Sequence, residues 1–284
     1  MNDLDQLSAA IPRLFAHPDL DAVRTEADAA FVELRRLLDR GLARAATPDP
    51  AAPGGWRTQV WVKQGILLGF RLGRLAEFPA AEPFRFFDKH TLPLHNFTVD
   101  DQVRIVPGGT TIRDGAYLAP GVICMPPAYV NIGAYVGTGT LIDSHALVGS
   151  CAQIGSRVHV SAAAQIGGVL EPVNAAPVIV EDEAMIGGNC GVYEGTRIGA
   201  GAVLASGTVL TRSTPVYDLV RERILRAEGD LPLIIPPAAV VVPGARAVTR
   251  GKGPEWGLSL YTPVIVKYRD DKTARAVELE DWLR

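Results

Sequence analysis

Four polar side chains in this chain are candidates for chemistry. Asp143 and His145 lie in the segment LIDSH, and Glu194 lies in GVYEG. Arg104 lies in VRIVP. A carboxylate or a neutral imidazole can accept a proton from a reacting group, and a guanidinium can bind an anion through two parallel hydrogen bonds. These residue types can supply a base and an anion-binding group if the fold brings them together.

The chain around these residues repeats every six positions. Small residues, mostly Ala and Thr, stand two positions before the repeated residue, and Gly directly follows it in several repeats. Because six is a multiple of two, a strand keeps the repeated residues on one face, whereas a helix scatters them around its axis. The repeated residues are Ile112, Leu118, Cys124, Val130, Val136, Ile142, Val148, Ile154, Val160, Ile166, then Val180, Ile186, Val192, Ile198, Leu204 and Leu210.

A strict repeat at so short a period predicts a solenoid in which each unit packs on its neighbours. One unit would be a short strand and a turn, and three units would close a triangular coil of 18 residues. We expect the aliphatic side chains to fill the interior, the small residues to let the walls come close, and the following Gly to relieve the turn. An ordinary β-sandwich does not explain this regularity. The fold class is therefore mainly β, a parallel β-helix, and the repeat resembles the hexapeptide-repeat family, in which the coil is left-handed.

The segments beside the repeat divide the chain into three parts. Residues 1–104 form a mainly helical N-terminal domain, with one helix from about Thr25 to Ala45 and a second, buried helix in WRTQVWVKQGILLGFRL. Residues 105–245 form the β-helix. The step from Ile166 to Val180 is eight residues too long, so residues 167–179 leave the coil as a loop. Residues 246–284 form a C-terminal extension, in which LSLYTPVIVKYRD contributes to a strand pair.

The composition excludes several classes of protein. A net charge of −3 gives no basic field for nucleic acid. No apolar run is long enough to cross a bilayer, and no signal peptide is visible, so we expect no membrane association and a cytoplasmic location. Three cysteines, two of them at inward positions of the repeat, indicate packed thiols rather than disulfides.

Longer motifs give a more specific resemblance. The segments YVNIGAYVGTGTLIDSHALVGSCAQIGSRVH and QIGGVLEP, with FFDK before the coil and TPVYD after it, resemble the tetrahydrodipicolinate N-succinyltransferases. The resemblance covers nearly the whole chain. It implies a homotrimer that transfers succinyl from succinyl-CoA, a co-substrate and not a permanently bound cofactor, to the amine of 2-amino-6-oxopimelate in the diaminopimelate pathway to lysine.

The resemblance also assigns roles to residues. Asp143 matches a position implicated in substrate binding and catalysis, and we take it as the base, with His145 as the alternative. Glu194 is the second catalytic carboxylate, and Arg104 matches an arginine that binds a substrate carboxylate. Some relatives carry another glutamate where this chain has Gly191, so a mechanism that needs that residue does not transfer.

Oxyanion and CoA contacts are less defined by the sequence. The candidates for them are Ser150, Gly167 and Gly168, since Gly permits close approach of a ligand to the backbone. Arg212 and Lys267 are weak candidates for the CoA phosphates. Glu171 and His159 fit solvated and structural roles better than functional ones.

Three other interpretations remain beside this one. An acetyl-CoA-dependent N-acetyltransferase would share the fold and most of the site. A non-catalytic β-helix scaffold would share the fold alone. A zinc enzyme of the γ-carbonic-anhydrase type would need three His ligands, but only His145 and His159 lie in the coil, so we expect no metal site.

Overall fold

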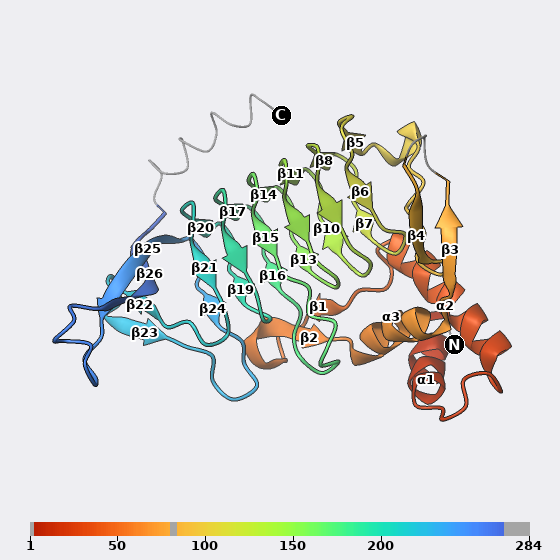
Figure 1. The fold of residues 1–284 in the computed structure, drawn as a ribbon, viewed down its shortest axis with the longest axis horizontal. Coiled ribbons are helices and arrows are strands. Elements are labelled where there is room, and N and C mark those ends of the chain that lie inside the picture. Colours follow the sequence, from red (N-terminus) through yellow and green to blue (C-terminus); the bar gives the residue numbers. More distant parts are fainter. Residues whose placement is uncertain (1–2, 80–83, 270–284) are drawn as a thin grey trace.

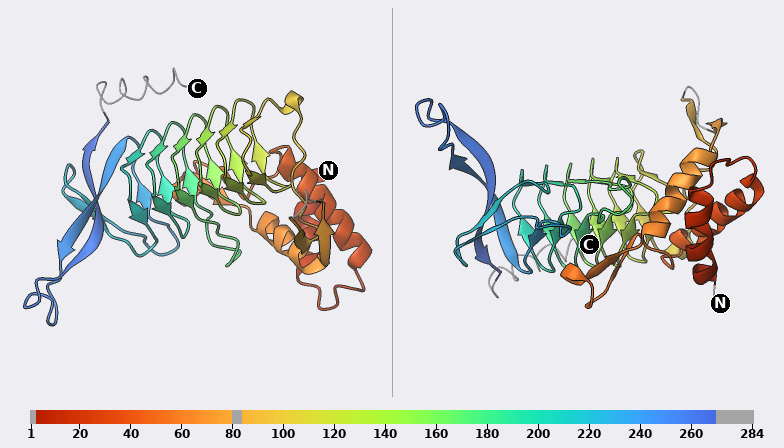
Figure 2. Two further views of the ribbon diagram at one scale, coloured as in Figure 1. Left: turned by 45° about the horizontal axis from the view of Figure 1, so that its top comes forward. Right: turned by 90° about the horizontal axis from the view of Figure 1, so that it is seen from below.

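The computed structural model describes residues 3–79 and 84–269. Helices gather at the N-terminal end of a column of stacked coils, and a long hairpin leaves the other end (Figure 1, Figure 2). The N-terminal elements are helices α1 (Asp3–Phe15), α2 (Arg24–Asp39) and α3 (Val60–Leu72), 3₁₀ helices η1 (Pro53–Gly55) and η2 (Val99–Asp101), and strands β1 (Ala46–Pro48), β2 (Trp56–Thr58), β3 (Leu75–Phe78) and β4 (Phe86–Lys89).

The column has three walls of parallel strands. Wall A contains β5 (Arg104–Ile105), β8 (Ile123–Cys124), β11 (Leu141–Ile142), β14 (His159–Val160), β17 (Met185–Ile186), β20 (Val203–Leu204) and β25 (Ala239–Ala247). Wall B contains β6 (Thr111–Ile112), β9 (Tyr129–Val130), β12 (Leu147–Val148), β15 (Gln165–Ile166), β18 (Gly191–Val192) and β21 (Val209–Leu210). Wall C contains β7 (Tyr117–Leu118), β10 (Tyr135–Val136), β13 (Gln153–Ile154), β16 (Ile179–Val180), β19 (Arg197–Ile198) and β24 (Ile234–Ile235).

The predicted six-residue register is confirmed. Each repeated residue is the second residue of its strand, and all of them are at most 6% exposed. Ile142 pairs with Cys124 on one side and Val160 on the other, a spacing of 18 residues. Ile154 pairs with Val180, because the inserted loop lies between them. The predicted fold class, a left-handed parallel β-helix with a helical N-terminal region, is likewise confirmed.

The predicted role of the glycines that follow the repeated residues is wrong. Those at 137, 149, 155, 167, 187 and 199 do not have positive φ. A Cβ on Gly137 would lie 2.6 Å from the Gly155 carbonyl carbon, and one on Gly187 would lie 2.6 Å from the Leu204 oxygen. These glycines therefore let corners of successive coils stack closely. The left-handed turn residue stands two positions later, for example Gly133 and Gly139.

The N-terminal segment covers wall C and its corner with wall B. The Arg44 guanidinium lies 3.6 Å from the Tyr135 ring centroid, and its Nε donates to Gln153 Oε1 at 2.9 Å. Ile132 and Cys151 of the corner are buried in the same apolar core as the three helices. β1 and β2 run along the column beside this wall (Figure 1). Wall B is contacted at its two ends, where the His95 N–H donates to the Ile112 carbonyl and the Tyr261 hydroxyl bonds to Val209.

The helix predicted from Thr25 to Ala45 ends at Asp39 instead. Gly41 has φ +65°, and Leu42 and Ala43 donate their N–H groups back to the Leu37 carbonyl, which closes the helix. A Cβ on Gly41 would lie 2.9 Å from the Tyr117 ring, so the early end also allows close approach to wall C.

The last strands of the described chain form a hairpin. β25 pairs antiparallel with β26 (Ser259–Tyr268), and β26 pairs in parallel with β22 (Val216–Asp218), which pairs with β23 (Arg223–Leu225). None of the helices in the described ranges has the length and apolar content needed to cross a bilayer.

Candidate active site

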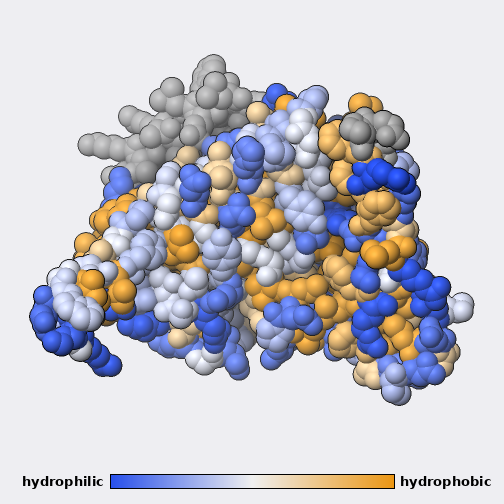
Figure 3. All heavy atoms as spheres, viewed as in Figure 1, coloured by the Kyte–Doolittle hydropathy of each residue, from blue (hydrophilic) through white to orange (hydrophobic). Residues whose placement is uncertain are grey.

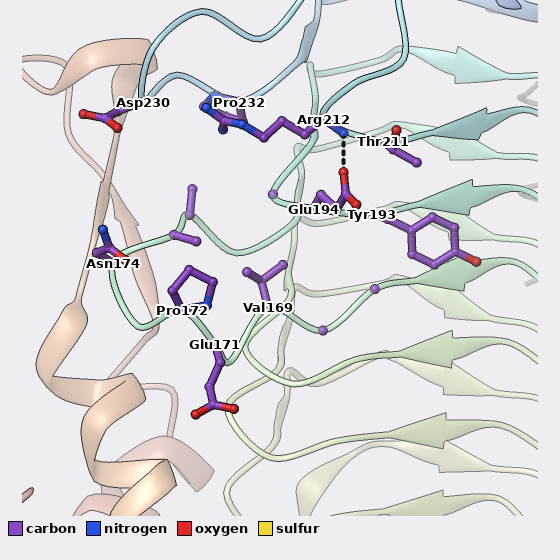
Figure 4. Close-up of a pocket in the computed structure, with 15 residues that line it drawn as sticks. Val169, Glu171, Pro172, Asn174, Tyr193, Glu194, Thr211, Arg212, Asp230 and Pro232 are labelled. Atoms are coloured by element: carbon purple, nitrogen blue, oxygen red, sulfur yellow. Dashed lines mark hydrogen bonds between the residues drawn. The ribbon is translucent and has the colours of Figure 1, made fainter.

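A cavity of about 1070 Å³ lies at the corner between walls B and C. It is bounded by the loop that leaves the coil after β15, by the corners after β18 and β21, and by the segment around Asp230 (Figure 4). Its lining includes the predicted site residues Gly167, Gly168 and Glu194, together with Glu171 and Arg212. The structure therefore gathers part of the predicted site in one cavity.

Glu194 and Arg212 lie on successive coils of this corner. Glu194 Oε2 accepts a hydrogen bond from the Arg212 backbone N–H at 2.9 Å (Figure 4). The Arg212 guanidinium donates to the Gly229 carbonyl across the cavity mouth. Glu194 has φ 53°, a left-handed conformation that is uncommon for a residue with a Cβ. The backbone thus holds this carboxylate at the cavity edge, whereas Glu171 projects away from it (Figure 4).

Two backbone donors lie beside the cavity. Gly168 is packed against Ser150, since a Cβ on Gly168 would lie 2.7 Å from the Ser150 nitrogen. Within the described chain, neither the Gly168 N–H nor the Ser150 N–H has an acceptor. The Gly167 N–H donates to the Val192 carbonyl at 2.8 Å, so it is committed to the strand ladder. Of the three candidates, Gly168 and Ser150 can still donate to a ligand.

Asp143 and His145 lie at a different corner, between walls A and B. Asp143 is half-buried, and its Oδ1 accepts from the Ser144 N–H at 2.7 Å. His145 is exposed and has φ 63°. Neither residue lines the cavity that contains Glu194. In one protomer, the structure therefore does not bring together the two predicted carboxylates.

Arg104 lies on wall A and does not line that cavity either. It is exposed and aligns with Ile123, which aligns with Leu141, two residues before Asp143. Two strand separations, about 10 Å, therefore lie between the level of Arg104 and that of Asp143. This spacing is compatible with the two side chains binding different ends of one small substrate.

The sequence analysis missed Lys63. It lies on α3, is 0% exposed, and donates from Nζ to the Pro172 and Ala175 carbonyls at 3.0 and 2.8 Å. Both acceptors belong to the loop that lines the cavity. A lysine in the apolar run WVKQGILLGF was the one available signal, because a charged residue at a buried helix position needs a partner.

A second ionisable cluster joins α2 to the first coil. His95 Nδ1 lies 3.0 Å from Asp39 Oδ1 and 3.5 Å from Asp114 Oδ1, and Arg35 Nε lies 2.9 Å from Asp114 Oδ2. Hydrogen bonds to Asp114 and Asp39 raise the pKa of His95 to about 9. The three side chains could hold a metal ion by their spacing, but the imidazolium and the Arg35 guanidinium already neutralise both carboxylates.

The coil and its repeat define the class of the protein. A family model described as "Hexapeptide repeat of succinyl-transferase" matches residues 177–212, and one described as "Tetrahydrodipicolinate N-succinyltransferase N-terminal" matches residues 6–72. The chain is thus a hexapeptide-repeat protein with the N-terminal region of one particular group of transferases.

Curated relatives identify the family within this class of proteins. A protein from Afipia carboxidovorans is 40% identical over 87% of this chain and 86% of its own length, and one from Albidiferax ferrireducens is 43% identical over 87% and 86%. One from Nitrosospira multiformis is 39% identical over 99% of both chains. All three are named 2,3,4,5-tetrahydropyridine-2,6-dicarboxylate N-succinyltransferase. The chain belongs to the tetrahydrodipicolinate N-succinyltransferase family.

Proposed function

We propose that this protein transfers succinyl from succinyl-CoA to the amine of 2-amino-6-oxopimelate, the ring-opened form of tetrahydrodipicolinate. The observation that carries the proposal is family membership, with about 40% identity to named succinyltransferases across nearly the whole chain. The reaction belongs to the diaminopimelate pathway to lysine, and we place it in the cytoplasm. The cavity beside Glu194 is lined by Gly168, whose N–H has no acceptor in the described chain, and this supports a site for acyl transfer.

In this proposal each of the candidate residues has a separate role in amide formation. Asp143 takes a proton from the substrate ammonium, so that the neutral amine attacks the thioester carbonyl carbon. The Gly168 and Ser150 N–H groups stabilise the oxyanion that forms there. The C–N bond forms and the C–S bond breaks, and the proton that the attacking nitrogen loses on forming the amide passes to the sulfur, so that CoA leaves as the thiol. Arg104 binds a carboxylate of the acceptor, and Glu194 holds or relays the proton of the amine.

The position of Asp143 and Glu194 on different corners supports a site between protomers. Corner A–B of one column must approach corner B–C of another before the two carboxylates can face one substrate. The chain's own N-terminal segment packs on wall C, so a second column would meet this one more readily through another part of its surface. A closed ring of three copies would satisfy this geometry with one repeated contact. We therefore propose a homotrimer with its active sites at the contacts between columns.

A comparison of the two acyl donors, succinyl-CoA and acetyl-CoA, tests the proposed function directly. Purified protein is incubated with the acceptor and with succinyl-CoA or acetyl-CoA at equal concentrations, and release of the CoA thiol is followed. We expect kcat/KM for succinyl-CoA to exceed that for acetyl-CoA by about tenfold or more, because the extra carboxylate has to be recognised by polar groups of the site.

Other outcomes would favour the alternatives. Equal or faster turnover of acetyl-CoA would make the protein an acetyltransferase of the same fold. If neither thioester released its thiol, and calorimetry detected no binding of either, the scaffold interpretation would replace the proposal.

A further inference from the structure

Lys63 carries a buried positive charge with an unusual set of partners. Its side chain is fully buried on α3, and in the parts of the chain that the structure describes no carboxylate pairs with it. Burial lowers its pKa from the ordinary value. An unpaired ammonium in a protein interior is costly unless hydrogen bonds compensate for lost water. Two backbone carbonyls supply that compensation here.

Both carbonyls belong to a short turn of the cavity loop. The Ala175 N–H donates to the Pro172 carbonyl at 3.0 Å, so the Pro172 oxygen accepts from both this amide and Lys63. The turn is thus stabilised both by its own hydrogen bond, from Ala175 to Pro172, and by Lys63 of α3. A charged donor strengthens each hydrogen bond relative to a neutral one.

The rest of the loop has few bonds of its own. The Val169 N–H donates to the Ser150 carbonyl at 3.3 Å, and Ala176 lies against the corner that carries Glu194, since a Cβ on Gly195 would meet the Ala176 oxygen at 2.6 Å. A displacement of the 172–175 turn would therefore move the wall that faces Glu194. Loops with so few internal contacts depend on such external anchors for their order.

We propose that Lys63 is a positioning residue, which holds residues 169–176 in the shape that forms one wall of the cavity and so sets the affinity for the ligand bound there. Its charge lies behind the wall and does not reach the reacting atoms. The statement about affinity rests on the proposed function, whereas the statement about the loop does not.

The test compares Lys63→Met, which keeps the length and apolar stem, with Lys63→Gln, which keeps an N–H donor without the charge. Lys89→Met is the matched control, because Lys89 Nζ also donates to a backbone carbonyl, that of Gly73 at 3.1 Å, far from the cavity loop. Hydrogen exchange of the Val169 and Ala175 amides, which donate to the Ser150 and Pro172 carbonyls, is measured without ligand. Steady-state kinetics with succinyl-CoA and the acceptor are measured on the same samples.

We expect Lys63→Met to speed exchange of these amides about tenfold or more and to raise KM by a similar factor, with kcat changed much less. Lys63→Gln should fall between Met and wild type, and Lys89→Met should match wild type in both measurements. Wild-type exchange and wild-type KM in Lys63→Met would overturn the proposal.

Two further outcomes keep the test decisive. If Lys63→Met does not fold, Lys63→Gln and the wild type are compared instead, and unprotected exchange of the Ala175 amide in the wild-type protein would refute the anchoring. If loop exchange responds as expected but the wild type does not turn over succinyl-CoA, the anchoring stands and the proposed function fails instead.

Discussion

At the scale of single residues, Asp143 and His145 lie on the same corner of the coil, and both are candidates for the base. Asp143 is half-buried, and within the described chain its carboxylate is bonded only through Oδ1, to the Ser144 N–H. His145 is more exposed and stands at the left-handed turn position, which Gly occupies in other repeats, for example Gly133 and Gly139. An exposed imidazole is well solvated, whereas a half-buried carboxylate with one open oxygen is better placed to contact an ammonium. The geometry favours Asp143.

The first prediction separates these two candidates. Asp143→Asn should lower kcat by about 10²- to 10⁴-fold, because the amide cannot take the ammonium proton. His145→Asn should change kcat by less than about tenfold, since Asn tolerates the left-handed backbone and our proposal assigns the base to Asp143. Steady-state kinetics and circular dichroism check both variants.

The control for this pair is Asp182→Asn. Asp182 is an exposed corner carboxylate whose Oδ1 accepts from the Ser156 N–H at 2.8 Å, a bond that Asn keeps. It should behave as wild type. Near-normal turnover by Asp143→Asn, or a larger loss in His145→Asn, would reassign the base to the histidine.

At the scale of elements, the repeat explains why so much of the fold could be predicted. Each coil closes on residues six apart, so local pattern and long-range packing agree at every strand, as for Ile142 between Cys124 and Val160. The end of α2 could not be predicted in this way, because it depends on close approach of Gly41 to Tyr117, 76 residues later in the chain. The role of Gly137 depends likewise on the coil above it, which a single repeat does not show.

The candidate site was less predictable than the fold for the same reason. Glu194, Gly167 and Gly168 meet because their register positions fall on one corner of successive coils, which the period determines. Lys63 meets Pro172 and Ala175 across more than 100 residues and two different structural elements. No periodic pattern encodes such a contact, so only the folded arrangement reveals it.

The interior of the coil supports a prediction on stability. Ile154 is fully buried between stacked coils, so Ile154→Ala should lower the free energy of unfolding by about 2–5 kcal/mol through lost burial and a cavity. Val99→Ala removes apolar atoms from a residue that is 93% exposed and should cost less than about 0.5 kcal/mol. Urea unfolding followed by fluorescence measures both. Similar costs for the two variants would contradict an inward-facing aliphatic series.

The junction between α2 and the first coil supports a prediction on pH. The pKa of His95 is raised to about 9 in the folded protein by Asp114 and Asp39, from an ordinary value near 6.5. A raised pKa means that the folded state binds the proton more tightly, so this contribution to stability is complete below about pH 6.5 and is lost as pH rises through 9. The contribution is on the order of 3 kcal/mol.

Thermal unfolding between pH 6 and pH 10 measures this dependence. The midpoint of the wild-type protein should fall across that range, and His95→Gln should show a lower midpoint at pH 6 with a flatter profile. If the unfolding midpoints of the two proteins changed with pH in the same way, the His95 imidazolium would not be stabilised by Asp39 and Asp114.

At the scale of the whole molecule, exposed apolar side chains gather at the two ends of the column. Large ones lie at both ends, on the β3–β4 hairpin and on the β25–β26 hairpin, and Figure 3 shows the apolar surface over the helical end. Monomeric soluble proteins rarely expose such groups together. They are Leu75, Phe84, Phe86 and Phe87 at one end, and Trp256, Leu258, Leu260 and Tyr261 at the other. If the proposed homotrimer forms, we expect these two ends to lie near contacts between chains.

Complementation tests whether the site is shared between chains. Asp143→Asn and Glu194→Gln should each be nearly inactive as pure trimers, since every site then lacks one carboxylate. Unfolding the two variants together and refolding them as a mixture should restore roughly a quarter of wild-type activity, because about that fraction of contacts joins an intact Asp143 to an intact Glu194 from the next chain. Light scattering should give a mass near three times the 30.3 kDa chain in every sample. If both carboxylates served a site within one chain, every chain in the mixture would still lack one of them and no activity would return. Recovery therefore requires that corner A–B of one column faces corner B–C of its neighbour.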